Sequence, residues 1–151
     1  MLDRFGTFAT TIASISRSVQ KIKSLEMKPL GLKGTHVMCL YFLGKEPEGL
    51  TASQLCRLCG EDKAAISRSI SDLTQKSLVH TVSAGQQRTY RAKIFLTEKG
   101  KESIAYINER VSHVLDVVGA GLTDSQRDSF YQSLALISNN LKTYIETEAE
   151  V

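Results

Sequence analysis

The chain has 151 residues, of which 42% are hydrophobic and 23% charged, and its formal net charge is +3. This length fits one domain with helical extensions, and the hydrophobic content allows an ordinary buried core. No apolar run approaches the ~20 residues of a membrane-spanning helix. The N-terminus also lacks the features of a secretory signal, so we expect a cytoplasmic protein without a membrane partner.

The first predicted element is an amphipathic helix over about residues 2–27. Its apolar side chains recur at spacings of three and four, a heptad-like pattern that is typical of helix–helix packing. They are Phe5, Phe8, Ile12, Ile15, Val19 and Ile22. Pro29 and Gly31 are expected to end this helix. A second helix, predicted from Thr35, is apolar on most sides and should be buried; residues 44–49 then form a turn.

Residues 51–76 have the pattern of two short helices that are joined by a tight turn. Thr51 is suited to cap the N-terminus of a helix through Leu58, and Asp62 is suited to cap a second helix that reaches about Lys76. This second helix is expected to bury Ile66, Ile70 and Leu73. The order helix, turn, helix predicts a helix-turn-helix.

The opposite face of that second helix carries small and basic side chains. Small side chains allow the backbone to approach the major groove of double-stranded DNA, and Lys or Arg can reach guanine or phosphate. The predicted DNA contacts on this face are Lys63, Ala64, Ser67, Arg68 and Ser71. The alternative interpretation is a solvated face on an ordinary short helix.

Two strands, residues 79–82 and 90–96, are predicted on either side of a loop at residues 83–87. Arg88, Arg91 and Lys93 lie at or near the tip of this hairpin. An arginine in such a position can enter the minor groove, so we predict that all three contact DNA. A merely solvated, charged strand is the alternative.

Positive charge is concentrated on the same part of the chain. Between Arg57 and Lys101 there are nine basic and four acidic residues, whereas the remainder has ten basic and twelve acidic residues. The segment with the helix-turn-helix and the hairpin therefore has a net charge of +5 and the remainder −2. Attraction to phosphate requires this kind of asymmetry.

Two more amphipathic helices follow, capped by Thr97 and Thr123 and separated by Gly119 and Gly121. Apolar stripes near both ends of the chain have no obvious internal partner, which predicts a homodimer. The predicted dimerisation residues are Phe5, Phe8, Ile12, Ile15, Val19, Phe130, Leu134, Ile137 and Leu141. The alternative is that the terminal helices pack on each other within one chain.

The predicted fold class is mainly α with a small β-hairpin wing (α+β), a winged helix-turn-helix with N- and C-terminal dimerisation helices. Residues 1–30 form the N-terminal dimerisation helix, residues 34–100 the DNA-binding domain, and residues 101–147 the C-terminal dimerisation helices. The sequence contains no motif that brings catalytic residues together, and it contains no phosphate-binding loop. We therefore predict neither an enzyme nor a cofactor.

The three cysteines, Cys39, Cys56 and Cys59, favour core packing over chemistry. An odd number argues against a disulfide framework, and zinc would need further ligands at suitable spacing, so no metal site is predicted. Cysteine commonly behaves as a small buried hydrophobe. The alternative is a redox-responsive regulator that uses these thiols, which would require an exposed thiolate of low pKa.

Residues 50–100 resemble the MarR (multiple antibiotic resistance regulator) family of winged-helix transcription factors, and the helix order extends the resemblance over nearly the whole chain. The matching pieces are, in chain order, Leu55-Cys56, Cys59-Gly60, Ser67-Arg68, Leu73 with Leu78-Val79, and Leu96-Thr97-Glu98-Lys99-Gly100. The resemblance implies an obligate homodimer and a sequence-specific transcriptional regulator. It also implies a repressor that binds a palindromic operator and is released by a small, often aromatic effector or by an oxidant.

Two positions depart from the family pattern. Arg88 stands where the family often has the aspartate of an Asp-x-Arg wing motif, which also leaves open a winged-helix protein-interaction module without DNA binding. Ser77 stands where a glycine usually follows the DNA-reading helix. Because serine is less favourable than glycine in a left-handed helix cap, we expect this helix to end differently.

Overall fold

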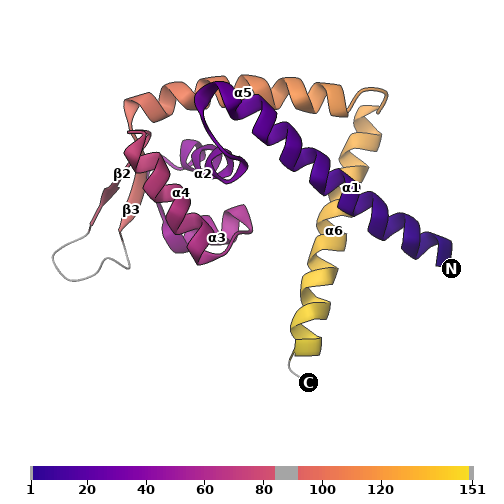
Figure 1. Ribbon diagram of the computed structural model, residues 1–151. Helices are drawn as coiled ribbons and strands as arrows, with labels where there is room; N and C mark the ends of the chain where they lie inside the picture. Colours follow the sequence, from indigo (N-terminus) through magenta and orange to yellow (C-terminus); the bar gives the residue numbers. More distant parts are fainter. Residues whose placement is uncertain (1, 84–91, 150–151) are drawn as a thin grey trace. The chain divides into compact units, whose positions relative to one another are not determined.

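A computed structural model describes residues 2–83 and 92–149 (Figure 1). The elements are α1 (Leu2–Met27), a 3-10 turn (Lys28–Leu30), α2 (Gly34–Lys45), β1 (Leu50–Thr51), α3 (Ala52–Cys59), α4 (Lys63–Gln75), β2 (Val79–Val82), β3 (Lys93–Leu96), α5 (Glu98–Val118) and α6 (Asp124–Ala149). The chain divides into two compact units, Met1–Val111 and Ser112–Val151. The predicted class, mainly α with a small β wing, is confirmed.

In the first unit, α2, α3 and α4 pack around a shared core beside the strands (Figure 1). Leu40 of α2, Leu55 of α3 and Ile66 of α4 are fully buried. Burial of α2 is confirmed, since Val37, Cys39 and Leu43 are buried as well. Of the three α4 residues that were expected in the core, Ile66 and Leu73 are buried and Ile70 is half-buried.

The helix caps follow the sequence closely. The Thr51 hydroxyl accepts a hydrogen bond from Gln54 N at 3.2 Å, and Asp62 Oδ1 accepts one from Ala65 N at 2.7 Å. Thr97 Oγ1 caps α5 by accepting from Gly100 N at 3.0 Å. Thr123 Oγ1 caps α6 in the same way. In each case the hydrogen bond joins the capping side chain to the backbone N–H three residues later, as in a typical N-cap. All four predicted caps are confirmed.

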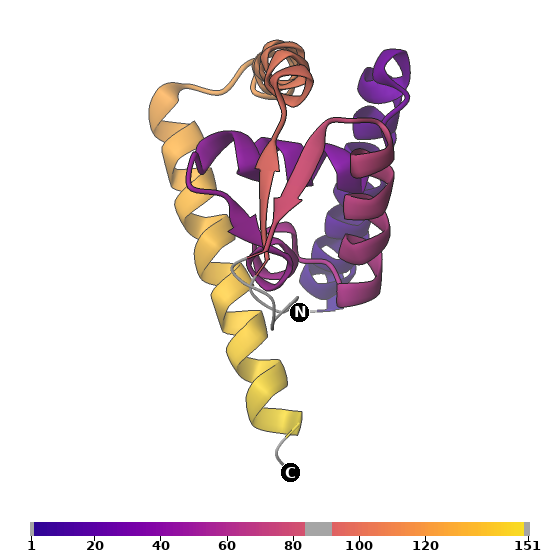
Figure 2. The same cartoon turned by 90° about the vertical axis from the view of Figure 1, so that its left-hand side faces the viewer.

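The described strands form a three-stranded antiparallel sheet in the order β1-β3-β2. Val79 pairs with Leu96 and Val82 with Lys93, and Figure 2 shows β2 and β3 side by side. The predicted second strand began at residue 90; the observed strand begins at Lys93, and residues 84–91 lie outside the described part. The hairpin prediction missed β1, because two residues are too few to show a period of two.

The end of α4 corrects the expectation for Ser77. This serine adopts φ 59°, and Leu78 N bonds to Leu73 O while Ser77 N bonds to Thr74 O, both at 2.9 Å. These bonds form a Schellman motif, the ending that glycine normally supports. The left-handed conformation costs about 1–2 kcal/mol without glycine. A hydrogen bond from a distant part of the chain offsets this cost, since the Thr97 hydroxyl donates to Ser77 O at 2.6 Å.

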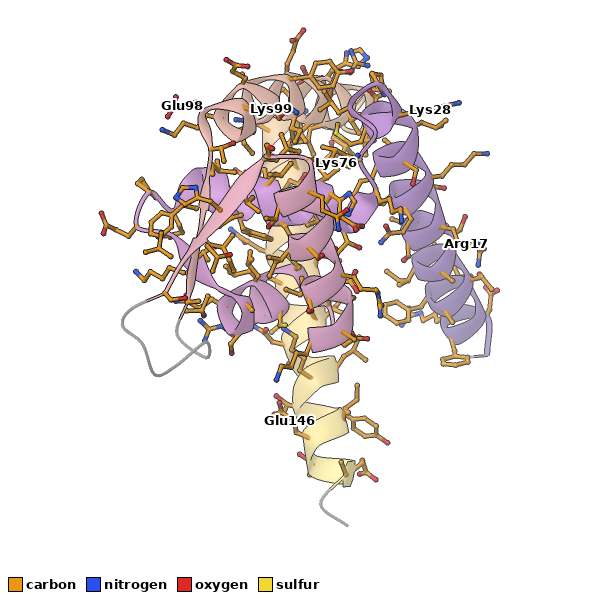
Figure 3. All side chains as sticks on the ribbon, turned by 60° about the vertical axis from the view of Figure 1, so that its left-hand side comes forward. Arg17, Lys28, Lys76, Glu98, Lys99 and Glu146 are labelled. Carbon is orange, nitrogen blue, oxygen red and sulfur yellow. The ribbon has the colours of Figure 1, made fainter. Side chains whose placement is uncertain are left out.

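A second contact holds the same turn against α5. Lys99 Nζ donates to the Lys76 carbonyl at 2.9 Å, and Figure 3 shows Lys76 and Lys99 at the adjoining ends of their helices. On the other side of the unit, Arg110 Nε of α5 donates to Glu26 Oε2 of α1 at 2.6 Å. This ion pair raises the pKa of Arg110. The first contact links α5 to the end of α4, and the second links α5 to α1.

The second unit contains the end of α5 and the whole of α6. No described side chain of α6 is buried, so its apolar residues lie open to solvent in the single chain. Among the described helices, none combines the length and the apolar character that would be needed to cross a membrane.

Candidate nucleic-acid interface

The exposed face of α4 is the main candidate interface. Lys63, Ala64, Ser67, Arg68 and Ser71 are all exposed, whereas Ile66, Ser69 and Leu73 on the other side are buried. This division follows from the helical period, since residues three and four apart share a face. The structure therefore brings the five predicted side chains to one accessible surface, and their role in DNA binding stays a prediction.

The wing is described only in part. Arg88 and Arg91, which were predicted to contact DNA, lie outside the described residues. Lys93 is exposed, and its ammonium group donates to the Glu48 carbonyl at 2.9 Å. A DNA contact by Lys93 would therefore compete with this bond to the turn before β1.

A buried histidine beside the α4 face was not predicted from the sequence. His36 is only 3% exposed. Its Nδ1 accepts a hydrogen bond from Lys33 N at 3.1 Å, and its Nε2 lies 3.3 Å from Asp72 Oδ2 of α4. Burial lowers the pKa of His36, and the hydrogen bond with Asp72 opposes this effect. The spacing of Lys33 and His36 resembles a capping box, which is the signal that could have revealed it.

A cavity of about 160 Å³ connects this histidine with the α4 face. It is lined by Lys33, Thr35 and His36 at the start of α2, and by Ala65, Arg68, Ser69 and Asp72 of α4. Arg68, a predicted DNA contact, therefore shares a hollow with the acidic partner of His36. The start of α2 and the exposed face of α4 form one connected surface.

The cysteines support the interpretation as core residues. Cys39 is fully buried, and Cys56 and Cys59 pack against the core in half-buried positions. A hydrogen bond with Cys59, together with burial, raises the pKa of the Cys39 thiol. The same hydrogen bond lowers the pKa of Cys59. Within the described residues, no group of three or more His, Cys, Asp or Glu side chains is arranged to hold a metal ion.

The apolar stripes that were predicted for dimerisation are exposed in the single chain. On α1, Phe5 is 73% exposed, and Phe8, Ile12, Ile15 and Val19 are also exposed. On α6, the exposed residues of the stripe are Phe130, Leu134, Ile137 and Leu141. Large exposed apolar patches commonly mark interaction surfaces.

Together, the α4 face, the sheet and the order of helices define a winged helix-turn-helix protein. A sequence profile described as the MarR family matches residues 30–88. The HTH-type transcriptional regulator TcaR of Staphylococcus aureus (strain Newman) is 34% identical over 109 residues, which cover 70% of this chain and 69% of that protein. The chain therefore belongs to the MarR family of transcriptional regulators.

Solved structures agree with this family assignment. A MarR transcriptional regulator from Methanosarcina mazei Go1 is 25% identical, with a TM-score of 0.76 and a match that covers 90% of each chain. A MarR family regulator from Listeria monocytogenes, solved in complex with a 26mer DNA, shares the fold at 21% identity. Its TM-score is 0.77, and the match covers 88% of this chain and 87% of that one. These relatives are named as regulators rather than enzymes.

Proposed function

We propose that this protein is a repressor that binds a palindromic operator in double-stranded DNA as a homodimer, and that a small aromatic effector releases it. The observation that carries the proposal is the exposed α4 face of small and basic side chains in a chain of this family. The DNA complex of the Listeria relative supports DNA as the ligand of the shared fold.

In this mechanism α4 lies in the major groove. Ala64, Ser67 and Ser71 allow close approach, while Lys63 and Arg68 reach phosphate or guanine. A two-fold dimer places its two α4 helices about one DNA turn apart, roughly 34–36 Å, which accounts for a palindromic operator. Binding of the dimer at a promoter would then exclude the transcription machinery.

The remaining predicted parts complete the arrangement. Arg88 and Arg91, with Lys93, would contact the minor groove or the phosphate backbone beside the α4 site. Residues 34–100 would form the DNA-binding domain. Residues 1–30 and 101–147 would form the dimer through the exposed stripes of α1 and α6.

Replacement of Arg68 with alanine is expected to weaken operator binding by about 1–3 kcal/mol, which is roughly 5- to 150-fold in affinity. The loss arises because a bidentate contact to guanine disappears, and sequence preference should relax at the contacted position. Fluorescence anisotropy with the DNA upstream of the protein's own coding region, across a salt series and beside a scrambled duplex, measures both effects.

Arg17→Ala is the matched control because Arg17 is an exposed arginine on α1 (Figure 3), so it removes the same charge outside the α4 face. Equal losses in the two variants would contradict a base contact by Arg68. Weak, equal binding of the wild-type protein to the native and scrambled duplexes would contradict an operator in this upstream DNA and favour a protein-interaction module.

The signal that releases the protein from DNA is either a small aromatic effector or an oxidant. Two cysteine side chains support the oxidant. Cys59 is half-buried, its pKa is lowered, and it shares a hydrogen bond with Cys39. A peroxide would oxidise the two thiols to a disulfide while it is reduced to two molecules of water. An oxidant signal predicts loss of two hydrogens in the intact mass after peroxide; an aromatic effector predicts a thermal shift with small aromatic acids and unchanged thiols.

A further inference from the structure

His36 connects two helices through a chain of hydrogen bonds with a defined direction. Nδ1 accepts from Lys33 N at 3.1 Å, so in the neutral ring the proton resides on Nε2. Nε2–H then donates to Asp72 Oδ2 at 3.3 Å. The neutral ring with its proton on Nε2 therefore accepts the hydrogen bond of the Lys33 N–H at the start of α2. At the same time it donates a hydrogen bond to the Asp72 carboxylate of α4.

The position of Asp72 makes this link relevant to the DNA-reading face. Asp72 follows Arg68 by four residues, so the two side chains lie one helical turn apart, and both line the cavity beside His36. A carboxylate that is free to turn toward Arg68 would pair with it and compete with DNA. The hydrogen bond from His36 instead holds Asp72 at the start of α2.

We propose that His36 is a positioning residue for α4, and that protonation of His36 weakens DNA binding by this helix. This inference rests on the proposed function for its DNA part, whereas the positioning of α4 by His36 is a property of the free protein. His36 itself is buried and acts through Asp72 and the backbone of Lys33.

Protonation disturbs the link because it places a hydrogen on Nδ1, which faces the N–H of Lys33. Two donors then oppose each other, so the ring has to turn away from Lys33 N. The N-terminal hydrogen bond of α2 is lost, and Asp72, which is paired with the ring, is drawn away from the position that the neutral ring gives it. The ion pair with Asp72 would gain, but burial outweighs this gain and the pKa of His36 lies below its ordinary value of 6.5. Further charged groups around the site are Lys33 before α2, Lys23 of α1 beside Gly34, Arg68 of α4, and Lys76 directly after α4.

The direction of the pH effect follows from the lowered pKa. The folded state favours the neutral ring of His36. The neutral ring therefore contributes its full share to folding stability above the pKa of His36 in the unfolded chain, which is about 6.5. It is lost as the pH falls from there toward the folded pKa. Affinity for DNA follows the protonation of His36 in the folded protein, so we expect it to fall about 3- to 10-fold as the pH falls through the folded pKa of His36, which lies below 6.5; this is the ratio that one hydrogen bond supplies.

His36→Gln tests the titration directly. Glutamine at this position can accept from Lys33 N as in a capping box, and its amide NH2 is a donor that can face Asp72, but it does not titrate. We expect the DNA affinity of this variant to stay constant on acidification, whereas that of the wild type falls. His113→Gln, which replaces an exposed histidine, should keep the wild-type pH profile. A pH profile of His36→Gln that matches wild type would overturn the inference.

Asp72 supplies a second pair of variants that separates the hydrogen bond from the charge. Asp72→Asn and Asp72→Ala both remove the negative charge, but only asparagine keeps an oxygen that can accept from His36 Nε2. Asparagine should therefore bind DNA about 3- to 10-fold more tightly than alanine at about pH 7.5. Equal affinities of the two variants would contradict positioning through this bond.

A measurement without DNA distinguishes failure of this inference from failure of the proposed function. Nitrogen chemical shifts of the His36 ring should show the proton on Nε2, and amide shifts of Arg68 and Ser71 should follow the titration of His36 in the free protein. In His36→Gln these amide shifts should stay constant over the same range. If wild type binds no DNA at any pH but the amides follow His36, positioning stands and the DNA function fails; a proton on Nδ1 or unresponsive amides would refute positioning itself.

Discussion

Replacement of Gly100 with alanine is expected to destabilise the first unit by about 3 kcal/mol or more, near the upper end of the range for overpacking. Gly100 is buried in the first turn of α5. A methyl group there would overlap the backbone oxygen of Leu78 and would press on the Leu96 side chain at 3.2 Å. A backbone atom cannot rotate aside as the end of a flexible side chain can.

The clash has consequences because Leu78 and α5 are joined at this point. Leu78 O accepts a hydrogen bond from Thr97 N at 3.0 Å, and Thr97 Oγ1 caps Gly100 N while it donates to Ser77 O. Movement of α5 away from Leu78 would strain these bonds together. Urea unfolding followed by circular dichroism should show a lower midpoint with little change in slope.

Gly6→Ala is the matched control for this substitution. Gly6 also lies in a helix, and an added methyl group would meet no atom within 4 Å. Because alanine favours helix over glycine by about 1 kcal/mol, this variant should be as stable as wild type or more stable. A Gly100→Ala protein that unfolds within about 0.5 kcal/mol of wild type would contradict the close approach of α5 to Leu78.

Replacement of Ile137 with aspartate is expected to weaken the proposed dimer by at least about 100-fold. Ile137 lies in the exposed apolar stripe of α6 with Phe130, Leu134 and Leu141. In a dimer that covers this stripe, the aspartate would become a buried carboxylate without a partner, which costs about 3–5 kcal/mol. Sedimentation equilibrium at several protein concentrations measures the dissociation constant.

Asn139→Asp controls for the added charge on the same helix. Asn139 is exposed and lies two residues from Ile137, on the opposite side of α6 from the stripe. We expect this variant to dimerise like wild type and to bind the operator like wild type, whereas Ile137→Asp should lose affinity for a palindromic duplex. A monomeric wild-type protein at all concentrations, or equal dissociation constants for the two variants, would contradict a dimer through α6.

Much of the secondary structure could be predicted because its signals are local. Thr51, Asp62, Thr97 and Thr123 each cap a helix through a bond to a residue three positions later. The exposed side of α4 was also predictable, because burial of Ile66 and Leu73 turns Arg68 and Ser71 to the opposite face. These features need only the helical period and the chemistry of short polar side chains.

Ser77 shows where local rules fail. Propensity alone disfavours serine in a left-handed cap, yet Ser77 adopts φ 59°. The hydroxyl of Thr97, twenty residues later, donates a hydrogen bond to the Ser77 carbonyl. No pattern in the sequence near Ser77 indicates this partner. The short strand β1 was missed for a similar reason, since Leu50 is recognised as a strand residue only through its pairing with Ile94.

The sequence by itself therefore determined the class of protein, the helices with their caps, and the small, basic surface of α4, since these depend on spacing within a turn or two of helix. Only the tertiary structure decided the contact of His36 with Asp72, thirty-six residues away, and the close approach of Gly100 to Leu78. It likewise decided the ion pair of Glu26 with Arg110, eighty-four residues away. Such contacts depend on which buried surfaces meet when the helices pack, and a periodic pattern along one segment carries no information about the partner that it meets.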